Sequence, residues 1–192
     1  ILADPEGEGY GFACGVYERV KEIGGRDYPL EFVDVTKEKF RDGEYTVRVD
    51  KNVRRHNCFY IHDSNKPPME WFTDLAFTLE AIHSSSASET NVVFPYFRFA
   101  RQDRKDRSRV SVNSRVVADV VSKYAQGGLT VDLHSAQITE FFSGSNFRSL
   151  DNLYSFKYTF SPKYATTTTS VDINFNFNDN KNLANRIFGV IG

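Results

Sequence analysis

The sequence has few of the features that mark secreted or membrane-spanning proteins. Its two cysteines, Cys14 and Cys58, lie far apart and match no metal-ligand spacing, so neither a disulfide framework nor a zinc site is indicated. No apolar run reaches the roughly 18 residues that a membrane-spanning helix needs. A secretory leader is not recognisable either. We therefore expect a cytoplasmic protein with reduced thiols.

An excess of charge of either sign is also absent. The 24 Lys and Arg residues and 25 Asp and Glu residues give a formal net charge of −1. Domains that bind nucleic acid over a broad surface carry a basic surplus, so this balance argues against that class. Met69 is the single methionine, and the sequence runs from Ile1 to an apolar "FGVIG". From these two ends we expect that the sequence is part of a longer polypeptide.

The hydrophobic pattern alternates between strand-like and helix-like segments. Strands are predicted at 30–35, 45–49, 57–62, 91–97 and 129–133, and helices at 15–23, 69–86 and 114–124. In the second helix, one face is predicted to meet the core (Met69, Phe72, Ala76, Leu79, Ile82). The pair Gly127-Gly128 is predicted to end the third helix. Alternating strands and helices predict an α/β fold with a mostly parallel sheet covered on both faces.

A dense group of charges follows the strand at 91–97. Residues 101–109 hold five cations and two anions, a local net charge of +3. "DLH" closes the strand at 129–133, and loops at the carboxyl ends of parallel strands open on one edge of the sheet. Asp132 and His134 are two residues apart in an extended segment, so both point to the same side. Together with the cations they predict a site for a polyphosphate with Mg²⁺.

Other interpretations of these residues stay open at this point. A mixed-charge run is most often a solvated surface loop, and a nucleic-acid patch is disfavoured by the interleaved Asp103 and Asp106. Asp132 could belong to a turn at a strand end and His134 could be a core histidine. Residues 42–44 alone are typical of a turn. The remaining histidines share no spacing and receive no role (His56, His62, His83).

Four stretches, taken in order and spacing, resemble one family. They are "FARQDRKDRSR", "SRVVADVV", "LTVDLHSAQITEFF" and "DNLY", preceded by "KFRDGEYTVRVDKNVRRHNCFYIHDSN". This set is similar to the N-terminal half of ribose-phosphate pyrophosphokinase, or phosphoribosyl pyrophosphate synthetase, over about residues 36–154. The resemblance implies the type I phosphoribosyltransferase fold. It also implies transfer of the diphosphoryl group of ATP to the 1-hydroxyl of ribose 5-phosphate, with Mg²⁺, in subunits that assemble into dimers or hexamers.

The resemblance also assigns residues. Arg101, Gln102 and Asp103 would line the ATP site, with the loop continuing around the nucleotide through Arg104, Lys105 and Asp106. A second group would meet the adenine of a neighbouring subunit's ATP (Phe40, Asp42, Glu44). A third group would be the metal positions (Asp132, His134, Asp151). The implied catalytic positions are Arg101 and His134, the latter as a metal or phosphate contact rather than a nucleophile.

The resemblance weakens towards the end of the sequence. We expect residues 1–150 to form the N-terminal, ATP-binding domain and residues 151–192 a partial or degenerate start of the C-terminal domain. Lys163 stands where the family has an aspartate, and Ile173 and Asn174 stand in place of basic residues that act on the transition state. The alternative to a synthetase is therefore a non-catalytic, nucleotide-binding paralogue that regulates synthetase oligomers. An unrelated phosphate- or nucleic-acid-binding module is a third hypothesis.

Overall fold

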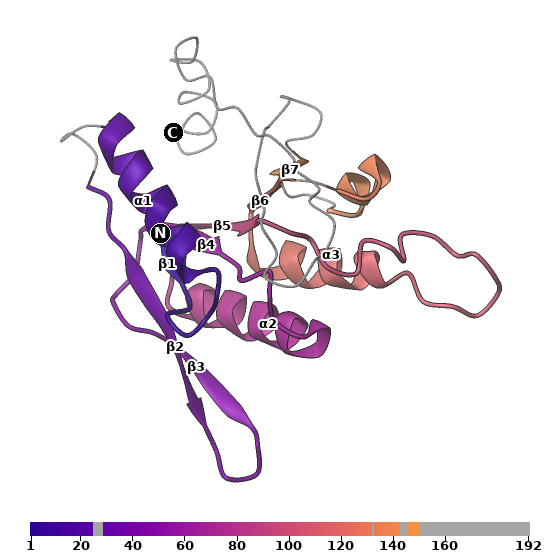
Figure 1. Ribbon diagram of the computed structural model, residues 1–192, viewed down its shortest axis with the longest axis horizontal. Coiled ribbons are helices and arrows are strands. Elements are labelled where there is room, and N and C mark those ends of the chain that lie inside the picture. Colours follow the sequence, from indigo (N-terminus) through magenta and orange to yellow (C-terminus); the bar gives the residue numbers. More distant parts are fainter. Residues whose placement is uncertain (25–28, 132, 143–145, 150–192) are drawn as a thin grey trace, which may run out of the picture. The chain divides into compact units, whose positions relative to one another are not determined.

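The computed structural model describes residues 1–24, 29–131, 133–142 and 146–149, which belong to one compact unit, Ile1–Leu150. Residues 151–192, the second expected domain, lie outside the described residues. The described part contains seven strands in one sheet, in the order β3-β2-β1-β4-β5-β6-β7. All neighbouring strands run parallel except β2 and β3, which form an antiparallel hairpin. The prediction of a mostly parallel sheet flanked by helices is confirmed (Figure 1).

The elements follow one another in an alternating order. They are β1 (Leu2–Ala3), α1 (Tyr10–Gly24), β2 (Val33–Lys39), β3 (Tyr45–Val49), β4 (Asn57–Ile61), α2 (Pro68–Ser84), β5 (Glu89–Phe94), α3 (Asn113–Tyr124), β6 (Gly127–Thr130), the 3-10 helix η2 (Ala136–Phe141) and β7 (Asn146–Ser149). The sheet lies between α1 on one side and α2 with α3 on the other (Figure 1). None of the helices in the described part is long and apolar enough to cross a membrane.

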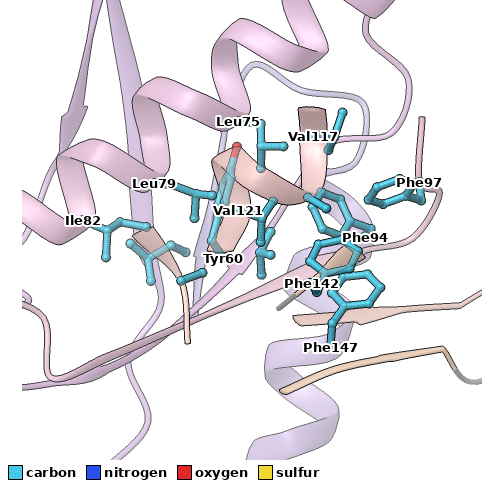
Figure 2. Close-up of a cluster of buried hydrophobic side chains, with 14 of the residues drawn as sticks. Tyr60, Leu75, Leu79, Ile82, Phe94, Phe97, Val117, Val121, Phe142 and Phe147 are labelled. Carbon is cyan, nitrogen blue, oxygen red and sulfur yellow. The ribbon is translucent and has the colours of Figure 1, made fainter. Parts of the chain in front are cut away.

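The main core lies between the sheet and the α2–α3 layer. Leu75, Leu79 and Ile82 of α2 and Val117 and Val121 of α3 are fully buried there, over aromatic side chains of the strands and the η2 region (Figure 2). The face under α1 holds a smaller cluster of Ala3, Ala13 and Ile61. Since burying an aliphatic side chain contributes about 1.5–3 kcal/mol, the larger cluster supplies most of the driving force for folding.

The buried face of α2 differs from the predicted one. Leu79 and Ile82 are buried as predicted, but Met69 is 71% exposed and the face is centred on Trp71, Leu75 and Leu79. The reason is that two polar side chains of this helix, Asp74 and Thr78, are also buried. A hydrophobic pattern counts such residues as solvent-facing, which rotates the predicted face away from the true one.

Several element boundaries also differ from the predicted ones. Helix α1 begins at Tyr10, five residues before the predicted start at Gly15. Helix α3 ends at Tyr124 as predicted, but Gly127 and Gly128 belong to β6, which begins two residues before the predicted strand. A Cβ added at Gly128 would lie 2.6 Å from the ring of Phe147, so a glycine is required where this ring crosses the strand.

Candidate functional site

The charged segment at residues 101–109, here called the basic loop, starts from a fixed turn after β5. Both Nε and Nη2 of Arg98 donate to the carbonyl oxygen of Ser64, at 3.2 and 2.9 Å, which ties this turn to the loop after β4. Phe99 has a φ of 64°, in the left-handed region that a bulky residue rarely adopts. Its ring packs against Trp71 and Phe72, which holds it in this conformation. The backbone therefore turns sharply immediately before Arg101.

The basic loop is also anchored to the start of α3. The carbonyl oxygen of Gln102 accepts hydrogen bonds from the backbone N–H and the hydroxyl of Ser114, at 3.3 and 3.1 Å. Arg109, at the far end of the loop, has a φ of 65°. Between these points the side chains of residues 104–109 are exposed. The loop is thus fixed at its root while its charged side chains reach into solvent.

A second loop leaves the neighbouring strand at the same edge. β6 pairs parallel to β5, and the backbone N–H of Val131 donates to the carbonyl oxygen of Phe94 at 3.3 Å. The chain then passes through the buried Leu133 to the exposed His134 and into η2, which Ile138 fixes in the core. Parallel pairing therefore brings His134 to the edge from which the basic loop extends.

A hydrogen bond joins the two loops. Nε2 of Gln137 in η2 donates to Oδ2 of Asp103 at 2.8 Å. This bond, with a further one from Ser135, holds the pKa of Asp103 below its usual range. Asp103 is nearly buried, at 9% exposure, in contrast to the arginines beside it. The Asp103 carboxylate thus serves as the internal tie between the loops and leaves the cations free to face outward.

An open cavity of about 420 Å³ lies between the two loops. It is lined by Arg101, Gln102, Asp103, Arg104, Asp106, His134, Ser135 and Gln137. Neither Arg101 nor Arg104 forms a salt bridge with a described residue, so their guanidinium groups are available to an incoming anion. Arginine forks bind phosphate oxygens in pairs.

The structure brings together most of the residues assigned to ATP by resemblance, but not all of them. Lys105 lies in the basic loop without lining the cavity. Asp132 and Asp151 lie outside the described residues. The group assigned to the adenine of a neighbouring subunit lies elsewhere, at the turn of the β2–β3 hairpin (Phe40, Asp42, Glu44). This hairpin extends from a different part of the unit than the basic loop (Figure 1).

The hairpin turn has a well-defined local geometry. Gly43 has a φ of 93°, which favours glycine, and its N–H donates to the carbonyl oxygen of Phe40 at 3.2 Å. The backbone N–H of Glu44 donates to Oδ1 of Asp42 at 3.1 Å. Phe40 is 51% exposed. An aromatic ring exposed on a turn of this kind is available to a partner outside this unit.

Sequence reasoning missed two residues of the cavity. Ser135 and Gln137 line it and contact Asp103, yet only Asp132 and His134 of the "DLHSAQI" stretch were assigned roles. The sequence carries no local signal for Gln137, because its partner Asp103 lies 34 residues away.

The comparisons with known proteins agree with these motifs. A family model described as the N-terminal domain of ribose phosphate pyrophosphokinase matches residues 19–124. The ribose-phosphate pyrophosphokinase of Maricaulis maris is 38% identical over 121 residues, covering 62% of this chain and 38% of that protein. The enzyme of the same name from Corynebacterium efficiens is 31% identical over 134 residues, covering 69% of this chain and 41% of the relative.

A solved structure shares the fold. The crystal structure of phosphoribosylpyrophosphate synthetase from Mycobacterium smegmatis matches with a TM-score of 0.61 and 25% identity, over 80% of this chain and 49% of that one. The chain thus spans about two fifths of the length of these curated relatives and about half of the solved chain. Because the family model covers more than half of the sequence, including β2 to β5 and the whole basic loop, the chain belongs to the ribose-phosphate pyrophosphokinase family.

Proposed function

We propose that this chain binds Mg²⁺–ATP in the cavity between the basic loop and η2, as the N-terminal part of a ribose-phosphate diphosphokinase. The reaction would transfer the diphosphoryl group of ATP to the 1-hydroxyl of ribose 5-phosphate and yield phosphoribosyl pyrophosphate and AMP. The observation that carries the proposal is the convergence of Arg101, Arg104 and His134 on one open cavity. Family membership supports the same activity.

The residues of the cavity suit a triphosphate chemically. Attack on the β-phosphorus of ATP requires that charge on the phosphate oxygens is neutralised and that the reactants are held in line. Arg101 and Arg104 would bind phosphate oxygens, and Gln102 would contribute a neutral donor. His134 would contact the metal or a phosphate, with no covalent intermediate on the protein.

The donor set at this edge fits a magnesium ion that arrives with its nucleotide. No group of three or more His, Cys, Asp or Glu side chains capable of holding a metal is present among the described residues. Mg²⁺ bound to a nucleotide needs only one or two protein ligands, because phosphates and water complete its shell. His134 would be one such ligand, with Asp132 and Asp151 as the further proposed positions. The ion would supply charge neutralisation at the phosphates.

Self-association belongs to the same proposal. Phe40, Asp42 and Glu44 lie on the hairpin turn and not at the cavity, so they would meet ATP held by a neighbouring copy of the chain. The exposure of Phe40 supports this role, since an aromatic ring can stack on adenine. The assembly would be a dimer or a hexamer.

A nucleotide-binding subunit without transferase activity is the second candidate. It is favoured by Lys163, Ile173 and Asn174, which replace residues expected in the sugar-phosphate half of the site. The purified protein, supplied with Mg²⁺, ATP and ribose 5-phosphate, distinguishes the two. AMP release that depends on ribose 5-phosphate supports the synthetase, while Mg²⁺–ATP binding without AMP release supports the regulatory subunit. If Mg²⁺–ATP does not bind, both proposals are wrong.

A further inference from the structure

The β2–β3 hairpin extends beyond the other strands of the sheet as a two-stranded ribbon. β1 pairs with β2 only through Leu2 opposite Val33 and Ala3 opposite Asp34. From Val35 to Lys39, the strand partner of β2 is β3 (Figure 1). An isolated two-stranded ribbon is marginally stable in water, so side-chain contacts must fix the direction in which it points.

The face of the ribbon that meets α2 changes from apolar to charged along its length. Val33 and Val35 point into the core, and two residues further on the same side of the strand lies Lys37. The Lys37 side chain is only 8% exposed. A buried ammonium group needs a carboxylate partner, because an unpaired charge in the interior is strongly destabilising.

Asp74 of α2 provides that partner and contacts both strands of the ribbon. Its Oδ2 lies 2.9 Å from Nζ of Lys37 on β2. Its Oδ1 accepts a hydrogen bond of 2.6 Å from the hydroxyl of Tyr45 on β3. The Asp74 side chain is 2% exposed. The ring of Tyr45 also packs edge-on against Phe77, 5.6 Å away, so the same helix holds the strand by two contacts.

Two further buried charges belong to this cluster, and the exposed Glu70 lies 3.9 Å from Lys37 at its edge. Nζ of Lys66 lies 2.5 Å from Oδ2 of Asp74 and also contacts Asp4, which in turn lies 2.9 Å from Nζ of Lys37. The buried group thus contains two ammonium groups and two carboxylates and is neutral as a whole. Burial alone would raise the pKa of Asp74, but the hydrogen bonds from Lys66, Tyr45 and Lys37 outweigh it and lower that pKa.

A satisfied buried charge cluster fixes geometry more strictly than an apolar contact does. A methyl group can slide over its neighbour at little cost, whereas a displaced ammonium group loses its carboxylate in a medium of low dielectric constant. Because Asp74 has one oxygen for each strand, it restrains the ribbon against both tilting and twisting. The hairpin turn at residues 40–44 lies at the far end of this ribbon.

We propose that Asp74 is a positioning residue that fixes the direction of the hairpin and so places Phe40, Asp42 and Glu44 for contact with nucleotide. It acts through Tyr45 and Lys37 and touches no substrate. The part of this inference that concerns nucleotide rests on the function proposed above. The mechanical part, that Asp74 holds the ribbon, concerns the free protein and can be tested without any ligand.

The sharpest variant is Tyr45→Phe, because it removes one hydrogen bond to Asp74 and leaves the buried charges paired. Tyr60→Phe is the matched control. The Tyr60 hydroxyl is also buried and makes a 2.8 Å hydrogen bond, but to Nδ1 of His62 and not to Asp74. Asp74→Asn is the stronger variant, and Tyr45→Phe keeps the test valid where Asp74→Asn fails to fold.

Two measurements are compared across these variants in the full chain. Hydrogen exchange of the backbone amides of residues 36–49 reports on the ribbon without ligand. Since a hydrogen bond to a charged group contributes about a tenfold factor or more, Tyr45→Phe is expected to speed exchange there about tenfold. Tyr60→Phe should leave these amides unchanged. The dissociation constant of Mg²⁺–ATP is then expected to rise severalfold for Tyr45→Phe and to stay within about twofold for Tyr60→Phe.

The outcomes separate the two parts of the inference. Equal exchange of the hairpin amides in Tyr45→Phe and the wild type would overturn the positioning role of Asp74. Faster exchange with an unchanged dissociation constant would confirm that Asp74 holds the ribbon and would overturn the contact between the hairpin and nucleotide. A wild type that binds no Mg²⁺–ATP would refute the proposed function, while the exchange experiment would still decide the role of Asp74.

Discussion

Gln137 and Asp103 lie 34 residues apart in the sequence and join the two loops of the candidate site through one hydrogen bond of 2.8 Å. The bond runs from an uncharged amide on η2 to a carboxylate in a loop that is otherwise rich in cations. It holds the Asp103 carboxylate against η2 while Asp103 still lines the cavity and remains within electrostatic range of Arg104.

Gln137→Ala is expected to loosen the basic loop. Loss of a hydrogen bond to a charged group should weaken Mg²⁺–ATP binding by about 5- to 20-fold, because Asp103 becomes free to pair with the arginines. Calorimetric titration measures this change. Glu140→Gln, on the exposed side of the same helix, is the control and should bind as the wild type does. Equal affinity of Gln137→Ala and the control would contradict the tie between the loops.

Gln137→Ala is also expected to change the pKa of Asp103. Because the hydrogen bond from Gln137 is the largest cause that lowers the pKa of Asp103, its removal should raise that pKa towards the ordinary value of 3.8. An NMR titration of the Asp103 carboxyl carbon follows this shift. A pKa that is the same in Gln137→Ala and the wild type would show that the bond does not form in solution.

Arg101→Ala is expected to weaken Mg²⁺–ATP binding by about 10- to 100-fold. The reason is that a guanidinium–phosphate pair is a charge-assisted, often bidentate contact. Arg107→Ala is the matched control, because Arg107 carries the same charge in the same loop but does not line the cavity. It should change the dissociation constant by less than about threefold. Equal losses of affinity in the two variants would mean that the loop acts only through its general charge. The difference in affinity between the variants should persist in 0.5 M salt, a concentration of about three times the physiological level.

Two glycine substitutions should act in opposite directions on the free energy of unfolding. Gly128→Ala is expected to destabilise the protein by about 1–3 kcal/mol, because the new Cβ would lie 2.6 Å from the Phe147 ring and 3.2 Å from the Val92 carbonyl oxygen. Gly15→Ala should stabilise it by about 0.5–1 kcal/mol, since this helical glycine is exposed with nothing within 4 Å of the added Cβ. Urea denaturation measures both changes, and a neutral Gly128→Ala would contradict the close contact of β6 with Phe147.

Stability is expected to fall in moderately acidic solution because of His62. The ring is fully buried and satisfied, with Nδ1 accepting from the Tyr60 hydroxyl and Nε2 donating to the Trp71 carbonyl oxygen at 3.0 Å. Burial and the nearby Lys66 lower its pKa to about 3. Below pH 6.5 the unfolded chain therefore binds a proton at His62 that the folded chain does not bind. The stabilisation of the folded state that comes from His62 is complete above pH 6.5 and is lost as the pH falls towards 3.

The expected loss of stability has a definite size and can be compared with that of a control variant. Between pH 6 and pH 4 the free energy of unfolding should drop by about 2 kcal/mol, since one proton corresponds to about 1.4 kcal/mol per pH unit. His62→Gln should flatten this slope. Asp74, whose pKa is lowered, stabilises the folded state above pH 3.8 and adds its loss only below that value. An identical slope in His62→Gln and the wild type would contradict the assignment to His62.

Sequence reasoning predicted the parallel sheet and the motif residues of the candidate site because both leave local signals. Alternation of strands and helices fixes the layer arrangement, and the basic run and "DLH" lie at strand ends where parallel pairing joins them. The role of Gln137 could not be predicted in this way. Its partner is 34 residues distant, and nothing in the local pattern distinguishes it from a solvent-facing amide.

The buried charges were missed for a related physical reason. Lys37, Lys66 and Asp74 are each polar in sequence, and their burial is possible only because folding brings them together from β2, the loop after β4, and α2. No single segment of the sequence contains all the charges that neutralise one another. The buried face of α2 was predicted wrongly for the same reason. Asp74 occupies a core position, whereas a hydrophobic pattern assigns charged residues to the solvent side. Catalytic roles, metal ligands and assembly stay predictions.

The position of β1 has a consequence for the order in which the protein can fold during its synthesis. This strand consists of Leu2 and Ala3, yet it lies between β2 and β4, with Leu2 opposite both Val33 and Tyr60. Its two sides are therefore completed at different times as the chain emerges from the ribosome, and the second side only after β4 has appeared. Until then Leu2 and Ala3 have a strand partner on one side only, and closing the middle of the sheet depends on one of its longer-range pairings.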